Sequence, residues 1–90
     1  MVTIGNVDTF VNPQANKNQA KKVLEESAEV FAAWQRWSEG EEGKAKVLEE
    51  CADLIQVTCN LVKALGIENF VGFMVACKQK NESNGYRYDS

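Results

Sequence analysis

The chain has 90 residues and a net charge of −3, with 44% hydrophobic and 26% charged residues, which is the composition of one small globular domain. It contains no histidine, which excludes a Ser-His-Asp triad, a Cys-His nucleophile and a His-ligated metal or haem. Any acid–base chemistry must therefore use carboxylates, lysine, tyrosine or a metal-bound water.

Neither targeting nor membrane insertion is expected. Residues 1–13 lack the cationic and apolar regions of a signal peptide, and no stretch approaches the ~18 apolar residues that a membrane span requires. The three cysteines, Cys51, Cys59 and Cys77, are odd in number and have no CxxC spacing, which argues against disulfides and a structural zinc site. We therefore expect a cytoplasmic protein whose reduced thiols belong to its core.

Charge is unevenly distributed along the chain. Residues 1–22 carry one acidic and three basic residues, residues 23–53 carry nine and three, and residues 54–90 carry three and four. An acidic middle with mildly basic flanks differs from the basic stripe of a surface that binds phosphodiester backbones. Duplex nucleic acid is therefore not an expected partner.

Apolar residues recur with helical periodicity along most of the chain, and strand signals are nearly absent, so the predicted fold is all-α. The expected helices span residues 16–37, 44–65 and 67–81. We expect an N-terminal arm at residues 1–15, a helical domain at residues 16–82 and a polar C-terminal tail at residues 83–90. The arm is predicted to be a loop or a loosely docked segment, because it holds the only proline, Pro13, and several turn-forming residues.

The first two helices are predicted to form a hairpin. The segment SEGEEG at residues 38–43 is a short polar turn, and a short turn makes consecutive helices antiparallel neighbours. Gly66 stands where the end of the second helix favours a left-handed residue. The apolar side of the first helix is expected to comprise Ala20, Val23, Val30, Phe31, Trp34 and Trp37. A hairpin with one further helix leaves a wide apolar face uncovered, so we expect a homodimer or tetramer whose pairing completes a four-helix-bundle-like core.

The most informative feature is an internal repeat. Residues 22–30 read KVLEESAEV and residues 46–54 read KVLEECADL, with six of nine positions identical. On antiparallel helices, two copies of one segment approximate a two-fold relation, so their equivalent faces converge. In each copy two carboxylates lie three residues apart, and residues at this spacing are neighbours on a helix surface. These pairs are Glu26 with Glu29 and Glu50 with Asp53.

Both carboxylate pairs flank the apolar side of their helix, so we expect them to face the groove between the helices. Four carboxylates gathered there repel one another, and they destabilise the fold or take up protons unless a cation binds. A hard divalent cation such as Mg²⁺ prefers oxygen ligands and commonly bridges carboxylates to substrate phosphates. Glu25 and Glu49, which precede each pair, are candidates for outer ligands or for a general base. Solvated helix faces also carry such acidic patterns, so the residues alone leave a non-enzymatic helical interaction module open.

With EExxE on one helix, ExxD on the next and 20 residues between Glu29 and Glu50, the sequence resembles the MazG-like all-α nucleoside triphosphate pyrophosphohydrolases. That family is related to phosphoribosyl-ATP pyrophosphatase and to the dimeric dUTPases. The resemblance covers residues 16–88 and is closest to the short single-domain members often encoded by phages and prophages. It implies hydrolysis of an NTP or dNTP to a nucleoside monophosphate and pyrophosphate. A dUTPase-like or a phosphoribosyl-ATP specificity is the alternative, and the latter is the less favoured of the two.

Carried over onto this sequence, the resemblance implies that Mg²⁺, or Mn²⁺ in its place, is held by Glu26, Glu29, Glu50 and Asp53. A glutamate, Glu25 or Glu26, is expected to act as the catalytic base that helps deprotonate the attacking water. The family's phosphate- and sugar-binding elements are similar to KQKN at residues 78–81 and to the following NGYR turn. Candidate substrate-binding residues are therefore Lys78, Asn81 and Tyr86, with Lys80 as an alternative to Lys78 near the β- and γ-phosphates.

Two tryptophans lie three residues apart on the first predicted helix. Trp34 is a candidate platform for stacking a nucleobase, and Trp37, three residues further along, can face the same side of the helix. Packing in the core or at a subunit interface is the commoner use of tryptophan. The sequence leaves both interpretations open.

Overall fold

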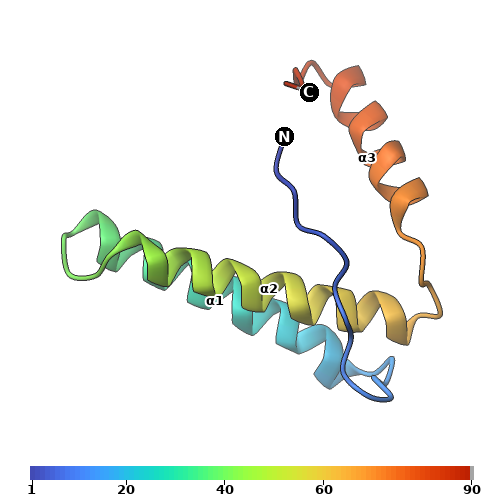
Figure 1. Ribbon diagram of the computed structural model, residues 1–90, viewed down its shortest axis with the longest axis horizontal. Coiled ribbons are helices and arrows are strands. Elements are labelled where there is room, and N and C mark those ends of the chain that lie inside the picture. Colours follow the sequence, from blue (N-terminus) through green and yellow to red (C-terminus); the bar gives the residue numbers. More distant parts are fainter. Residues whose placement is uncertain (90) are drawn as a thin grey trace.

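The computed structural model describes residues 1–89 and consists of three α-helices, α1 (Lys17–Ser38), α2 (Lys44–Ala64) and α3 (Val71–Ser83), with no strand in that range. The predicted all-α class is confirmed. The hairpin of α1 and α2 is antiparallel and closely packed, whereas α3 rises away from it and packs on neither helix (Figure 1). The last residue of the predicted tail, Ser90, lies outside the described residues.

The first two predicted helices are correct to within one residue at each end, but the predicted start of the third is wrong. Helix α3 begins at Val71, because the preceding residues form local polar contacts that compete with a helix. Glu68 pairs with Lys63 at the end of α2. The side-chain oxygen of Asn69 accepts a hydrogen bond of 3.1 Å from the Val71 N–H. Asparagine favours such turns over helix interiors, so the apolar spacing of this segment does not produce helix.

Each helix ends in the same backbone motif. After α2, Gly66 has a φ of +87° and donates to the Lys63 carbonyl at 2.9 Å, while Ile67 donates to the Val62 carbonyl at 3.3 Å. These two bonds define a Schellman motif, which requires a left-handed residue and satisfies carbonyls that the helix end leaves free. The predicted role of Gly66 is therefore confirmed, and the ends of α1 and α3 follow the same pattern at Gly40 and Gly85.

Little of the apolar surface is buried within one chain. Ala33 is the only fully buried apolar residue described, and the predicted apolar side of α1 divides, since Val23 and Val30 are half-buried while Phe31 and Trp34 are exposed. The accessible surface is 7291 Å², compared with about 5,200 Å² for a compact folded chain of this mass. The radius of gyration is 15.1 Å, compared with about 12 Å for a compact domain. Within residues 1–89, no helix combines the length and apolarity needed to cross a bilayer.

The N-terminal arm lies across α2 and is held there by two polar side chains (Figure 1). The side-chain oxygen of Asn60, which is 1% exposed, accepts a hydrogen bond of 3.0 Å from the Phe10 N–H. The Gln56 amide donates to the Asp8 carbonyl at 2.8 Å and to the same Asn60 oxygen at 3.1 Å. The arm is therefore anchored at its middle, although the apolar side chains of Val2, Ile4 and Val11 are exposed.

Candidate metal centre

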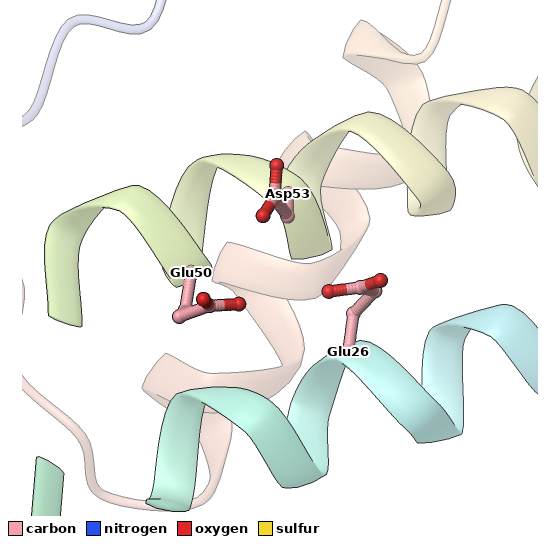
Figure 2. A group of neighbouring side chains, drawn as sticks. All are labelled: Glu26, Glu50 and Asp53. Atoms are coloured by element: carbon pink, nitrogen blue, oxygen red, sulfur yellow. The ribbon is translucent and has the colours of Figure 1, made fainter. Parts of the chain in front are cut away.

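Three carboxylates from the two repeats converge between α1 and α2. One carboxylate oxygen from each of Glu26, Glu50 and Asp53 lies within 4.8 Å of those of the other two. Glu26 extends from α1 toward α2, and the two α2 residues bring their carboxylates to the same region (Figure 2). The three side chains differ in burial, from buried Glu50 through half-buried Glu26 to exposed Asp53. The group thus opens to solvent on its Asp53 side.

The local cause of this convergence is the register of the hairpin. Glu50 and Asp53 are three residues apart, so they lie on adjacent turns of one face of α2. Glu26 occupies the position in the first repeat that Glu50 occupies in the second, and the antiparallel arrangement brings these equivalent positions together. Glu29, the fourth predicted ligand, is exposed and lies outside the group.

A lysine also belongs to this site. The Lys46 ammonium lies 3.3 Å from a carboxylate oxygen of Glu50 and 3.5 Å from one of Glu49. The hydrogen bond with Glu50, together with the charges of both glutamates, raises the pKa of Lys46 above its ordinary value. Sequence reasoning missed Lys46. The signal was the four-residue spacing from Lys46 forward to Glu50.

The residues present fit a hard divalent cation. All three donors are carboxylates, the ligand type that Mg²⁺ and Ca²⁺ prefer. Opposite oxygen ligands lie about 4.2 Å apart around Mg²⁺ and about 4.6–5.2 Å apart around Ca²⁺. Only one pair among three ligands can be opposite, and neighbouring oxygens around Mg²⁺ lie about 3 Å apart, so oxygens that lie within 4.8 Å of one another must close in by up to about 2 Å to bind the smaller ion. The Lys46 ammonium supplies positive charge to Glu50 that a bound cation would replace.

The remaining predicted site residues do not join the carboxylates within one chain. Glu25 is exposed on α1 and pairs with Lys22 at 3.5 Å. Trp34 is half exposed, and its ring stacks on that of Phe31 with a centroid separation of 6.2 Å. Lys78 and Asn81 belong to α3, which packs on neither α1 nor α2, and Tyr86 follows in the tail.

The tail contributes one aromatic residue that sequence reasoning overlooked. The Lys78 ammonium lies 5.2 Å from the ring centroid of Tyr88, and the Asn81 side-chain amide donates to the Tyr88 hydroxyl at 2.8 Å. Tyr86, the predicted tyrosine, is 68% exposed and donates its backbone N–H to the Asn81 carbonyl at 3.0 Å. No spacing rule singles out Tyr88, because its contacts depend on how the tail turns back after α3.

A large hollow lies away from the carboxylates. A groove of about 1100 Å³ runs between the arm, the second half of α2 and α3. Its lining is mainly apolar and includes Ile55, Val62 and Met74, together with Lys78 and Tyr88, but none of the three carboxylates. The groove is therefore best understood as an uncovered packing face, separate from the candidate metal centre.

A comparison with models of protein families shows which family this chain matches. The family model described as phosphoribosyl-ATP pyrophosphohydrolase matches residues 7–81. The matched range contains the anchored part of the arm, both repeats and α3 as far as Asn81, and thus every residue of the carboxylate group. No curated protein and no solved structure shows a significant match to the chain.

Proposed function

Because the chain belongs to the phosphoribosyl-ATP pyrophosphohydrolase family, we propose that it is a Mg²⁺-dependent nucleoside triphosphate pyrophosphohydrolase. Membership of the family, which lies within the MazG-like all-α superfamily, supports hydrolysis of a phosphoanhydride bond in a nucleotide. The proposal adds the metal and the substrate class. The observation that carries it is the convergence of Glu26, Glu50 and Asp53 from two repeats on facing helices.

We assign the metal site to these three carboxylates, with Glu29 as a fourth ligand one helical turn beyond Glu26. These residues would hold Mg²⁺, which when bound would supply positive charge to the triphosphate and lower the pKa of a water, and this chemistry suits a site without histidine. Glu50 is buried, so its position is the most restricted of the four, and it anchors the site. Exposed Asp53 lies on the side from which an anionic substrate approaches.

The proposed catalytic base is Glu26 or Glu25. Its carboxylate accepts a proton from the water as the water oxygen bonds to the α-phosphorus and the bond to the bridging oxygen of the β-phosphate breaks. The products are a nucleoside monophosphate and pyrophosphate. Glu26 lies in the carboxylate group, whereas Glu25 is exposed and paired with Lys22. The two assignments therefore predict different losses of activity when Glu25 or Glu26 is substituted.

Substrate binding is assigned to the predicted residues of α1, α3 and the tail. The Lys78 ammonium is suited to neutralise the β- and γ-phosphates, and Asn81 and Tyr86 contribute polar groups at the end of α3. Trp34 presents an exposed ring that suits stacking of a nucleobase.

These residues reach the carboxylates in a homo-oligomer. The accessible surface exceeds that of a compact chain by about 2,000 Å², which is the loss per chain expected of an obligate interface. Within residues 1–89, helix α3 packs on neither of the other helices, and it carries Phe73, Met74 and Val75 in exposed positions. We propose a homodimer, or a tetramer of such dimers, in which α3 of one copy completes the site of the other.

Phosphoribosyl-ATP is a second candidate substrate. The matched family model is described by that substrate, which is the specific observation in its favour. It carries the same triphosphate group, so the carboxylates and Lys78 would serve both substrates. A dUTPase-like specificity has no such support, because the match names no uridine nucleotide.

The test is hydrolysis of a panel of NTPs, dNTPs and phosphoribosyl-ATP with and without Mg²⁺, with products resolved by chromatography. We expect monophosphate and pyrophosphate only when metal is present. The products should be lost in Glu50→Gln and Asp53→Asn, and retained in Glu41→Gln, which removes an exposed carboxylate from the turn between α1 and α2. Melting temperature should rise with Mg²⁺ in the wild type and in the control only. No turnover and no metal-dependent stabilisation would favour an interaction module instead.

A further inference from the structure

The C-terminal tail turns back onto α3 through a specific backbone motif. Gly85 has a φ of +92° and donates to the Glu82 carbonyl at 3.1 Å, and Tyr86 donates to the Asn81 carbonyl at 3.0 Å. These are the two bonds of a Schellman motif, which reverses the chain direction at a helix end. The reversal explains how Tyr88, only five residues beyond the end of α3, meets side chains of its last turns.

Tyr88 contacts two residues that lie on one face of α3. Lys78 and Asn81 are three residues apart and are therefore neighbours on the helix surface. The Lys78 ammonium is 5.2 Å from the Tyr88 ring centroid, which is within the range of a cation–π interaction. The Asn81 amide nitrogen donates to the Tyr88 hydroxyl at 2.8 Å. One tyrosine thus restrains both the ammonium and the amide assigned above to substrate binding.

The contacts of Asn81 also fix which of its groups is free. Its amide nitrogen has two hydrogens, and besides the Tyr88 hydroxyl it lies 3.7 Å from the Cys77 sulfur, a weak acceptor. Both donors are thereby directed toward protein atoms. Among the described residues no hydrogen bond uses the side-chain oxygen of Asn81. The group that Asn81 presents to a ligand is therefore an acceptor.

We infer that Tyr88 is a positioning residue of the nucleotide site, which orients Asn81 so that its oxygen accepts a hydrogen bond from the nucleoside. This inference rests on the proposed function and deepens it. The complementary ligand group is an O–H or N–H donor, which on a nucleotide is a sugar hydroxyl or an exocyclic amino group. The same tyrosine holds the Lys78 ammonium one turn away, where it remains able to meet a phosphate.

The experiment compares Tyr88→Phe with Ser83→Ala in the full chain. Tyr88→Phe removes the hydroxyl and keeps the ring over Lys78, whereas Ser83→Ala removes a hydroxyl that bonds only to the Gln79 carbonyl at the same helix end. We expect KM to rise about fivefold in Tyr88→Phe with kcat within about twofold of wild type, because a positioning hydrogen bond is lost before substrate binds. Ser83→Ala should change neither constant.

Two comparisons identify the donor on the ligand. If a sugar hydroxyl is bound, the rise in KM should shrink relative to the ribonucleotide for the 2′-deoxynucleotide or the 3′-deoxynucleotide, whichever lacks that hydroxyl. If an exocyclic amino group is bound, it should shrink for uridine relative to cytidine nucleotides. Equal KM values for wild type and Tyr88→Phe with every nucleotide, or a loss confined to kcat, would overturn the inference while leaving the proposed function intact.

A binding measurement separates the inference from the activity. In spectra of ¹⁵N-labelled protein, the side-chain amide signal of Asn81, assigned with Asn81→Asp, should shift in Tyr88→Phe but not in Ser83→Ala. Titration with an α,β-methylene nucleotide analogue should shift it further in wild type, at lower concentrations than in Tyr88→Phe. If wild type hydrolyses no nucleotide, the proposed function fails, but the titration still tests the inference. An analogue that leaves the Asn81 amide signal of wild type unchanged would overturn the role of Tyr88.

Discussion

The two copies of the repeat differ far more in environment than in sequence. In residues 46–54, Glu50 is buried and forms an ion pair with Lys46, and Asp53 belongs to the carboxylate group. In residues 22–30, the equivalent Glu26 is only half-buried, and Lys22 pairs instead with the exposed Glu25. The second copy thus contributes two members of the group and the first contributes one.

The difference follows from what covers each helix. Helix α2 lies between α1 and the N-terminal arm, and nearly all its residues beyond Asp53 are at least half-buried. Among the three helices described, α1 packs only on α2, and Leu24 and Phe31 on it are exposed. Repetition of a motif therefore supplies equivalent side chains, but the rest of the chain decides which of them becomes the rigid part of a site.

The largest loss of activity is expected when Glu50, the buried carboxylate of the second copy, is replaced. Glu50→Gln should lower activity by more than the ~10–100-fold that losing an outer partner of a metal ligand typically costs, because no neighbour can replace a buried ligand. Glu25→Gln should lower activity much less if Glu26 is the base. Hydrolysis rates at saturating Mg²⁺ measure the loss of activity in both variants. Comparable losses in the two variants would contradict the assignment of Glu50 as the anchor.

The last carboxylates of the two copies give a second contrast. Asp53→Asn should weaken Mg²⁺ binding by about 10–100-fold, whereas Glu29→Gln should weaken it less than tenfold, since Glu29 lies outside the group. Isothermal titration of both variants with Mg²⁺ provides the two affinities. If Glu29→Gln proved the more damaging, bound metal would have to draw Glu29 into the site and leave Asp53 outside it.

The arm that covers α2 gives a third test. Asn60→Ala removes the acceptor for the Phe10 N–H and for Gln56 in a site that is 1% exposed, and should cost about 1–3 kcal/mol of unfolding free energy. Asn18→Ala, at an exposed position early in α1, is the matched control and should cost less than about 0.5 kcal/mol. Urea denaturation measures both, and similar midpoints would show that the arm is not anchored in solution.

The smallest effect concerns the two equivalent lysines. Contact with Glu50 raises the pKa of Lys46 above its ordinary 10.5, so the stability it contributes is present below pH 10.5 and is lost as pH rises through the higher value. Lys46→Met should therefore flatten the alkaline fall of the melting temperature and tighten Mg²⁺ binding, because a competing cation is gone. Lys22→Met is the control. Identical changes in its melting temperature and Mg²⁺ affinity would show that the two lysines do not differ in their effect on the site.

The parts of the structure that were predictable depend on local pattern. Helical spacing identified α1 and α2, and the repeat predicted a converging group of four carboxylates, of which three come together and Glu29 does not. The position of α3 was not predictable, because within residues 1–89 it packs on neither of the other helices. The contacts of Tyr88 depend on a chain reversal at Gly85, and those of Asn60 on a segment 50 residues away in sequence.

The scarcity of buried apolar residues has a consequence for abundance. Within residues 1–89 the only fully buried apolar residue is Ala33, so in the proposed assembly a chain would gain most of its hydrophobic stabilisation from association, and folding and assembly would be one concentration-dependent event. Below the dissociation constant of the proposed assembly, most chains would be neither folded nor active. Activity should then rise more steeply than in proportion to the amount of protein, which makes the level of synthesis itself a threshold control.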